Sequence, residues 1–395
     1  MKTLNDTNFK GKRVLVRVDF NVPMNEQKEI TDTTRITETL PTIHKILNDG
    51  GNPILMSHLG RPNGEINSKY SLAPVAQCLS HLLNTEVLFW EDYLQPEAIQ
   101  RSKALKPGQV VLLENLRFYK EEEGADETFA KTLAGLGDAY VNDAFGTAHR
   151  AHASTAIIAK FFRQNKYFGF LLEKEVKALD YVLQSAKAPF TAIIGGAKVS
   201  SKMKVIKNLI NRVDNLIIGG GMAYTFIKAM GGTVGNSLCE EKWIKATAKL
   251  VKEMTLKGVR LYLPLDSVCG DAFAPDCNVR YIDSNFIPDG WMGMDIGPKT
   301  IKSYAEVIQN SQTILWNGPM GVFEMKAFEK GTGSTSMAIA TATACGAFSM
   351  IGGGDSVAAV HQFGVEDYVS YISTGGGAML EYLEGAKLPG IKMLL

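Results

Sequence analysis

Short apolar runs alternate with longer amphipathic segments along the chain, and this alternation limits the folds open to it. Each run is rich in β-branched or aliphatic residues and is bounded by turn-forming residues, as in a buried strand. The pattern predicts βαβ units with mostly parallel sheets. The runs lie at residues 14–18, 53–56, 87–90, 110–113 and 139–141, and then at 191–194, 216–218, 261–263, 313–315, 348–351 and 371–373.

One amphipathic segment, residues 170–185, separates the two sets of runs, and its Leu172, Val176, Leu179 and Leu183 recur at helical spacing. A chain of 395 residues is long enough for two or three domains with cores of their own. We therefore expect an α/β fold with two doubly wound (Rossmann-like) parallel-sheet domains joined by an interdomain helix and hinge. The expected parts are residues 1–169 with 382–395, the helix 170–185, and residues 186–381.

Charge and composition exclude several classes of protein. The 42 Lys and Arg residues balance 41 Asp and Glu residues, and no basic stripe is interleaved with aromatic residues, so we expect no nucleic-acid partner. No apolar run approaches membrane-spanning length, and the start MKTLNDTNFKGK lacks the apolar core of a signal peptide. We expect a cytoplasmic protein without a membrane partner. The five scattered cysteines fit reduced thiols better than a zinc site.

The stretch MIGGGDSVAA, residues 350–359, reads as the end of a buried strand, a glycine turn and the first turn of a helix. Glycines let the backbone approach an anion closely, and the N–H groups and positive dipole of a helix N-terminus favour phosphate. Asp355 would repel that phosphate unless a divalent cation lay between them, which indicates a magnesium–nucleotide ligand. The alternative is that Asp355 only caps the helix, and the stretch alone does not decide between the two.

Ligands of doubly wound sheets bind at the carboxyl ends of the strands. In the first half the residues after the predicted strands are rich in arginine, histidine and amides, which suits a small anion, whereas in the second half they are rich in glycine. There is no GxxxxGK[ST] loop, no GxGxxG after the first strand and no catalytic triad pattern. Lys198 and Lys202 follow Gly195–Gly196 and are spaced to share one helical face, so we expect both to contact phosphate.

A series of motifs over nearly the whole chain, in the family's order, resembles phosphoglycerate kinases. The resemblance implies a glycolytic kinase that transfers a phosphoryl group reversibly between 1,3-bisphosphoglycerate and ADP to give 3-phosphoglycerate and ATP. It also implies Mg²⁺ bound with ATP or ADP and a monomeric and cytoplasmic protein. Because the acid ligands precede residue 170 and the nucleotide ligands follow it, we expect hinge bending near Gly169, at residues 186–189 and after Gly377. The motifs are RVDFNVP (17–23), SHLGRP (57–62), LLENLRF (112–118), NDAFGTAHRAHAST (142–155), GGAKV (195–199), GGGMAYTF (219–226), WNGPMGVFE (316–324), GGGDS (352–356) and STGGGA (373–378).

The resemblance also assigns site residues. The acid would be held by Asp19, Asn21, Arg35, His58, Arg61, Arg117 and Arg150. The nucleotide would be held by Gly196, Lys202, Gly220, Asn317, Pro319, Glu324, Gly352, Gly353, Gly354, Asp355 and Ser356, with Asp355 on the metal. The catalytic residues would be Arg35, Lys198 and Gly376, with Lys198 on the transferring phosphoryl oxygens. A carboxylate acceptor is already ionised at neutral pH, so the absence of a general base fits this chemistry.

The chain departs from the family pattern at three positions. Ser201 stands where an aspartate usually precedes the second lysine, Tyr371 where a histidine is usual, and Ala188 where an arginine often occurs. Without that aspartate, the orientation of Lys202 is in question. Two rival interpretations stay open: an enzyme such as a ligase or mutase that binds the same ligands without phosphoryl transfer between them, and a nucleotide-binding scaffold. The scaffold would need neither Lys198 nor Asp355.

Overall fold

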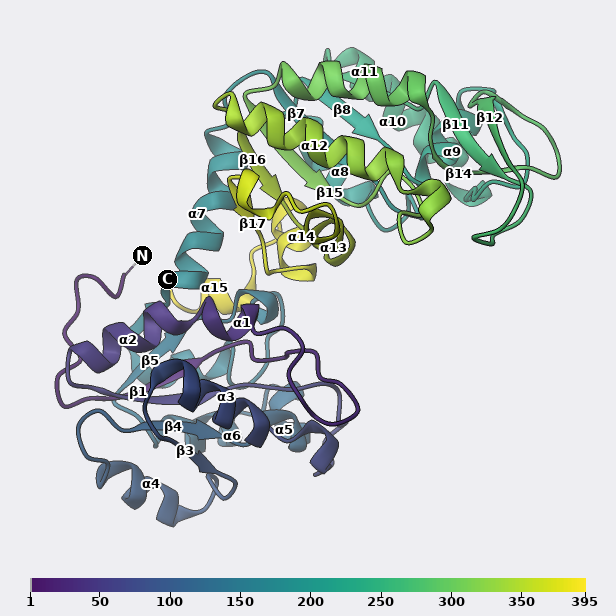
Figure 1. Cartoon of the computed structure of the whole chain (residues 1–395). Helices are drawn as coiled ribbons and strands as arrows, with labels where there is room; N and C mark the ends of the chain where they lie inside the picture. The colour runs from purple at the N-terminus through teal and green to yellow at the C-terminus, as the bar shows by residue number, and fades with distance from the viewer. Residues whose placement is uncertain (1) are drawn as a thin grey trace. The chain divides into compact units, whose positions relative to one another are not determined.

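The computed structural model describes residues 2–395 and contains two compact units (Figure 1). Unit 1 runs to Lys177 and also includes Lys387–Leu395, and unit 2 is Ala178–Ala386. The helix predicted at residues 170–185 is found as α7, Phe170–Gln184, and the chain passes from unit 1 to unit 2 inside it. The predicted domain boundaries, which set this helix apart from both domains, stay a prediction.

Unit 1 is built on a six-stranded sheet in the order β3-β4-β2-β1-β5-β6, and all of its strand pairs are parallel. The strand order reverses at β1, which pairs with β2 on one side and β5 on the other. In such sheets the ligand site lies where the order reverses. The strands are β1 (Arg13–Arg17), β2 (Asn52–Met56), β3 (Val87–Trp90), β4 (Val110–Leu113), β5 (Ala139–Asn142) and β6 (Lys166–Phe168).

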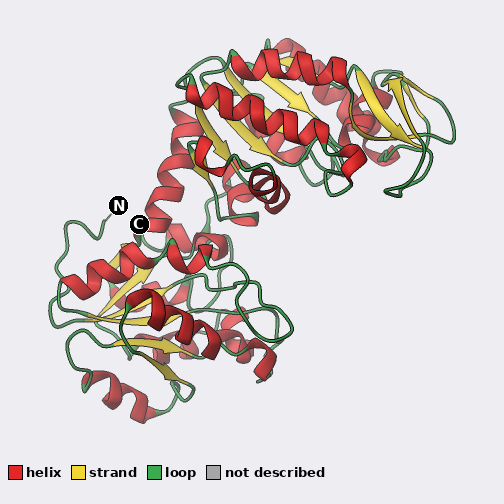
Figure 2. Ribbon diagram, viewed as in Figure 1, coloured by secondary structure: helices red, strands yellow, loops and turns green. Residues whose placement is uncertain are grey.

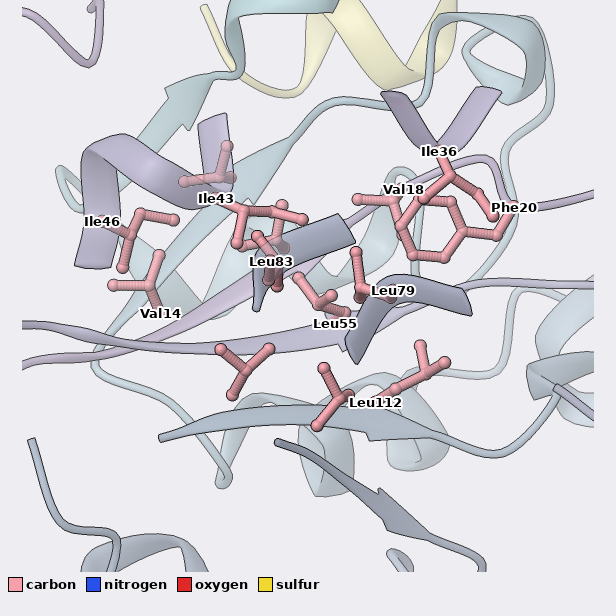
Figure 3. Close-up of a cluster of buried hydrophobic side chains, with 14 of the residues drawn as sticks. Val14, Val18, Phe20, Ile36, Ile43, Ile46, Leu55, Leu79, Leu83 and Leu112 are labelled. Atoms are coloured by element: carbon pink, nitrogen blue, oxygen red, sulfur yellow. The ribbon is translucent and has the colours of Figure 1, made fainter. Parts of the chain in front are cut away.

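The apolar core of unit 1 lies between this sheet and helices α2 (Leu40–Asn48) and α3 (Ala73–Leu83) (Figure 3). Ile43 and Ile46 lie one turn apart on α2 and are fully buried in the same cluster as Val14 of β1. The other helices of this part are α1 (Thr34–Thr37), α4 (Pro96–Lys103), α5 (Lys120–Glu123), α6 (Glu127–Ala134) and α15 (Pro389–Lys392).

Unit 2 has its own six-stranded parallel sheet, in the order β10-β8-β7-β15-β16-β17. This is the strand order of a dinucleotide-binding sheet, with the reversal between β7 and β15. Helices cover both faces of the sheet (Figure 2). The strands are β7 (Phe190–Ile194), β8 (Asn215–Ile218), β10 (Arg260–Tyr262), β15 (Thr313–Asn317), β16 (Phe348–Ile351) and β17 (Tyr371–Ile372), and the helices are α8 (Met203–Leu209), α9 (Met222–Ala229), α10 (Ile244–Leu256), α11 (Pro298–Gln309), α12 (Lys330–Ala344), α13 (Gly354–Gln362) and α14 (Gly377–Leu383).

Unit 2 also contains small sheets that were not predicted from the sequence. Strand β11 (Asp266–Gly270) pairs antiparallel with β12 (Val279–Asp283) and with β14 (Met292–Ile296), and β9 (Thr233–Val234) pairs with β13 (Phe286–Ile287). β12 is mostly exposed, and β9 and β13 are two residues long, so none of them gives an apolar run. The predicted fold class of two Rossmann-like parallel-sheet domains is confirmed.

The C-terminal segment belongs to unit 1. Leu388, Ile391 and Leu394 are buried. The Gly390 N–H group donates to the Ala148 carbonyl at 2.8 Å. The end of the chain is therefore fastened to the loop that follows β5.

Candidate active site

A cationic cluster lies at the carboxyl ends of the strands of unit 1. Asp19 follows β1, and its carboxylate forms an ion pair with Arg35 Nη1 at 2.5 Å. His58 follows β2 and is buried, with its Nδ1 3.3 Å from Arg17 Nη2 and 3.8 Å from Asp19 Oδ1. Residues from β1, α1 and the loop after β2 thus meet at one place.

Gly60 joins a second pair of predicted residues to this cluster. Its N–H group donates to Asn21 Oδ1 at 2.8 Å, and its carbonyl accepts from Arg117 Nη1 at 2.9 Å. Arg117 is largely buried and also lies 3.3 Å from Glu123 through its Nε. The loops after β1, β2 and β4 are therefore held together by the backbone of one glycine.

Burial and nearby positive charge lower the pKa of two histidines of this cluster, His58 and His152. Burial holds the pKa of His58 well below its ordinary value, and Arg17 and Arg117 lower it further. For His152, burial and then Arg117, Arg17 and Arg150 lower the pKa to about 3. Both imidazoles are therefore neutral at pH 7, and the arginines supply the positive charge that would attract an anion.

The structure brings together five of the predicted acid-site residues through direct contacts or shared partners: Asp19, Asn21, Arg35, His58 and Arg117. Arg150 is exposed and interacts with this group through its charge. Burial is the largest cause of the lowered pKa of Arg117, and the charge of Arg150 lowers that pKa further. Arg61 is exposed next to Gly60, and its side chain forms no hydrogen bond or ion pair with any of residues 2–395.

Unit 1 also contains a buried polar network that was not predicted from the sequence. Arg17 is fully buried in β1, and its Nε donates to Ser154 Oγ at 2.8 Å. Ser154 in turn donates from its N–H group and its hydroxyl to Glu122, at 2.9 and 2.6 Å. The charged Arg17 inside an apolar strand was the available signal, because a buried charge requires a partner.

Three loops meet at the carboxyl ends of β7, β8 and β15 in unit 2. The Gly196 N–H group donates to the Pro319 carbonyl at 3.1 Å, the Gly220 N–H group to Met320 at 3.0 Å, and the Met222 N–H group to Gly196 at 2.9 Å. Gly220 has a φ of 66°, and a Cβ there would lie 2.7 Å from the Gly196 backbone. Glycine is required for this close approach.

Asn317, the last residue of β15, links the lysine loop to the GGGDS loop. Its Oδ1 accepts a hydrogen bond from Lys202 Nζ, and its Nδ2 donates to the Gly352 carbonyl at 2.6 Å. The neighbouring Gly318 N–H group donates to Ser356 Oγ at 2.6 Å. Four residues predicted to hold the nucleotide are thereby joined around the point where the strand order reverses.

Asp355 lies in the first turn of α13 and does not cap it. The cap position is Gly353, with a φ of 93° and no side-chain hydrogen bond, so the interpretation of Asp355 as an N-cap is wrong. The Asp355 carboxylate is exposed, and no hydrogen-bond donor among residues 2–395 reaches it. Burial lowers the pKa of Lys202, and the charge of Asp355 opposes that shift.

The residues around Asp355 suit a metal ion that takes most of its ligands from phosphate and water. Residues 2–395 contain no group of three or more His, Cys, Asp or Glu side chains that could hold a metal ion. Mg²⁺ in nucleotide sites commonly takes one or two carboxylates and completes its coordination with phosphate oxygens and water. The lone carboxylate of Asp355 at the start of α13 matches that donor set.

Comparison with known proteins gives the family of this chain. The family model described as phosphoglycerate kinase matches residues 4–386. A phosphoglycerate kinase of Porphyromonas gingivalis is 51% identical, and the match covers 98% of this chain and 99% of that protein. The chain belongs to the phosphoglycerate kinase family. A second phosphoglycerate kinase, from Chlorobium limicola, is also 51% identical, over 100% of this chain and 99% of its own length.

Solved phosphoglycerate kinases have the same fold. That of Coxiella burnetii has a TM-score of 0.92 at 42% identity and covers 100% of this chain and 98% of its own. That of Pyrococcus horikoshii OT3 has a TM-score of 0.83 at 33% identity, with the same coverage. The predicted family and enzyme class are thus confirmed. As for membranes, none of the helices in residues 2–395 is long and apolar enough to span one.

The structure explains one departure from the phosphoglycerate kinase pattern, Ser201. Ser201 donates from its hydroxyl to the Lys198 carbonyl at 2.8 Å and so closes the turn that carries both lysines. Lys202, without a neighbouring aspartate, is held by Asn317 instead. The structure does not explain Ala188 or Tyr371.

Besides Arg61 and Asp355, three further predicted residues, Lys198, Glu324 and Gly376, lack direct ties to the rest of the group. Lys198 and Glu324 are exposed, and Gly376, with a φ of 46°, precedes α14. In the part of the chain that the structure describes, no hydrogen bond joins their side chains or N–H groups to the other predicted site residues. The loop that contains Gly376 does begin beside the GGGDS loop, since the Ser373 N–H group donates to the Ile351 carbonyl at 2.8 Å.

Proposed function

We propose that unit 1 binds the acid substrate and unit 2 binds the nucleotide with Mg²⁺. The chain is a glycolytic kinase, which transfers a phosphoryl group reversibly between 1,3-bisphosphoglycerate and ADP to give 3-phosphoglycerate and ATP. One observation carries the assignment of sites: arginines gather at the strand ends of unit 1, whereas glycine backbone and Lys202 gather at those of unit 2. The first set suits a small anion and the second a nucleotide phosphate.

In this proposal the acid is held by the arginines of unit 1. Arg117, Arg150 and Arg61 pair with the phosphate and carboxylate oxygens, and Asp19 keeps the Arg35 side chain in place through their ion pair. His58 is neutral because of its lowered pKa, so it offers a hydrogen bond without adding charge. Asn21 fixes the loop that carries Arg61 by binding the Gly60 N–H group.

The nucleotide is held by backbone groups and Lys202. The glycine loops around Gly196, Gly220 and Gly352 let phosphates and the base approach the chain closely, and Pro319 and Glu324 border them. Asp355 holds the Mg²⁺, together with the phosphates. The metal ion supplies neutralisation of phosphate charge when it is bound. Ser356 and the N–H groups that begin α13 are available to the same phosphates.

Lys198 has the catalytic role in this scheme. The attacking carboxylate of 3-phosphoglycerate is ionised, so the chain has no proton to remove and needs only to position and to neutralise. Lys198 is exposed and reaches from the turn that Ser201 closes, so its ammonium is available to the oxygens of the moving phosphoryl group. Arg35 and the N–H groups around Gly376 are proposed to add to that stabilisation. We further infer a monomeric, cytoplasmic protein that bends at a hinge.

The proposal is tested by Lys198→Ala, with Lys204→Ala as the control. Lys204 is an exposed lysine of α8 and belongs to no proposed contact. Loss of a preorganised donor should remove about 2.7–4 kcal/mol of transition-state stabilisation, which lowers kcat about 100- to 1,000-fold. ADP affinity should change little. A coupled assay of ATP formation from ADP and 1,3-bisphosphoglycerate measures this. A change in KM alone would make Lys198 a ground-state ligand.

A further inference from the structure

We infer that Glu240 is a positioning residue that fixes the loop carrying Lys198 and Lys202. Ser200 lies between these two lysines, and Glu240 lies 40 positions further along the chain. The Ser200 N–H group donates to Glu240 Oε2 at 2.8 Å, and the Ser200 hydroxyl donates to Oε1 at 2.6 Å. One carboxylate therefore holds the middle of the loop by two hydrogen bonds. The inference rests on the lysine roles proposed above.

Apart from the bond that the Lys202 side chain donates to Asn317, the other polar contacts at this turn are internal to it. Ser201 Oγ donates to the Lys198 carbonyl at 2.8 Å, and the Lys202 N–H group donates to the Val199 carbonyl at 3.0 Å. These bonds shape the turn but do not orient it in unit 2. Glu240 orients the turn, because it lies in a distant segment of the chain and accepts both bonds from Ser200. These bonds are charge-assisted because the acceptor is a carboxylate. The exposed Lys198 depends most on this anchor, since its side chain has no partner of its own among residues 2–395.

Glu240 is itself fixed to a second part of the site. Its N–H group donates to Thr225 Oγ1 at 3.1 Å. Thr225 is 1% exposed and belongs to α9, the helix that follows the loop Gly219–Gly221. The anchor thus connects the lysine loop to the helix behind another glycine loop. A catalytic group must be held to within a fraction of an ångström, because small displacements cost much of the rate.

The neighbouring Glu241 differs in each of these respects. Its side chain is exposed and lies 4.0 Å from Lys228, at the limit of an ion pair. Glu240, in contrast, forms no ion pair among residues 2–395, and both of its carboxylate oxygens accept hydrogen bonds from Ser200. Its carboxylate is therefore placed to orient backbone and hydroxyl groups, and Glu241 offers a control of the same chemistry one position away.

The test compares Glu240→Ala with Glu241→Ala in the purified full chain. Loss of the anchor should lower kcat about 10- to 100-fold and change the KM for ADP by less than about threefold, because the loop remains but its lysines are misplaced. Ser200→Ala should give a smaller loss of kcat. Glu240→Gln, which keeps the shape and one acceptor oxygen, should restore part of it. Glu241→Ala should match the parent.

Circular dichroism and thermal unfolding separate this role from a purely structural one. A folded Glu240→Ala protein with the kcat of the parent overturns the inference, even if its Tm is lower. If Glu240→Ala does not fold, Ser200→Ala decides: unchanged kcat overturns the inference. The double variant Ser200→Ala/Glu240→Ala should lose less kcat than the two single effects combined, because both changes break the same contact.

Lys198→Ala in the same assay keeps this inference distinct from the proposed function. If Lys198→Ala retains full turnover, the proposed role of that lysine fails, and the reason for its anchor fails with it. If Lys198→Ala loses turnover and Glu240→Ala does not, the lysine role stands and only the anchor is overturned.

Discussion

Arg61 and Arg150 are the two exposed arginines among the proposed acid ligands, and they are the ones least committed to contacts within the protein. We predict that Arg61→Ala and Arg150→Ala each weaken 3-phosphoglycerate binding by about 1.5–3 kcal/mol, the usual contribution of a hydrogen bond to a charged group. ADP affinity should not change. Isothermal titration calorimetry with each ligand measures both effects.

The matched control for these variants is Arg101→Ala. Arg101 stacks over the Trp90 ring at 3.9 Å and donates to the Asp92 carbonyl, so the change removes the same charge from another part of unit 1. Normal 3-phosphoglycerate binding to both Arg61→Ala and Arg150→Ala would move the acid site elsewhere.

Single residues differ in how far the sequence alone reveals them. His58 and Arg117 could be predicted because each lies in the short loop after an apolar run, where the sheet places ligands. The partners of Arg17 and Ser200 could not, because Ser154 is 137 positions from Arg17 and Glu240 is 40 positions from Ser200. No local pattern in the sequence marks such pairs, and only the folded chain brings them together.

Among the elements, the junction of β14 and α12 holds a buried acid. Asp295 Oδ2 accepts from the Gly331 N–H group at 2.6 Å, at the start of α12. A Cβ at Gly321 or Gly331 would overlap the Asp295 side chain, so both glycines are needed to make room for it. Burial raises the pKa of Asp295 to about 7. The free energy of unfolding therefore depends on pH through this group.

The sign of that dependence follows from proton binding. Between the unfolded pKa of about 4 and the folded pKa, the folded state binds more protons at Asp295, so its contribution to stability falls as pH rises. We predict that Asp295→Asn gains about 3 kcal/mol relative to the parent between about pH 5 and about pH 8. Denaturant unfolding at both pH values measures it. A difference that is constant with pH would show that Asp295 does not titrate there.

Strands also differ in how far the sequence alone reveals them. The strands at Val87–Trp90, Val110–Leu113 and Phe348–Ile351 were predicted at their observed bounds because their residues are mostly buried and, except for Ser349, apolar. β12 was not, because its side chains are mostly exposed and its pairing with β11 supplies the order that its sequence lacks. The antiparallel sheet is thus specified by tertiary pairing rather than by a local pattern.

The C-terminal helix α15 supports the loop after β5. A Cβ at Gly390 would lie 3.0 Å from the Ala148 backbone, so the two segments are in close contact. We predict that deletion of residues 391–395 lowers kcat about tenfold with little loss of secondary structure, because the loop that carries Arg150 loses its support. Removal of Leu395 alone, which is 77% exposed, is the control and should leave kcat unchanged. Unaltered turnover after the longer deletion would remove the tail from the mechanism.

At the scale of the whole molecule, α7 has its two ends fastened to different units. Near its start the Phe170 N–H group donates to Thr42 Oγ1 at 2.9 Å, inside unit 1. Near its end Asp180 accepts from the Tyr382 hydroxyl at 2.8 Å, inside unit 2. Each unit therefore includes one end of this helix, and the chain crosses between the units once more after Ala386.

Phosphoryl transfer requires the reacting oxygen and phosphorus to come within about 3–3.5 Å with water excluded. If unit 1 holds the acid and unit 2 the nucleotide, each ligand alone contacts only its own unit, and only the pair can stabilise a closed state fully. We predict that 3-phosphoglycerate together with a non-hydrolysable MgATP analogue lowers the radius of gyration more than either ligand alone. Small-angle scattering of the free, singly liganded and doubly liganded protein measures it. Equal radii in all four states would contradict hinge bending, and the same titration with Arg150→Ala should lose the response to the acid but keep nucleotide binding.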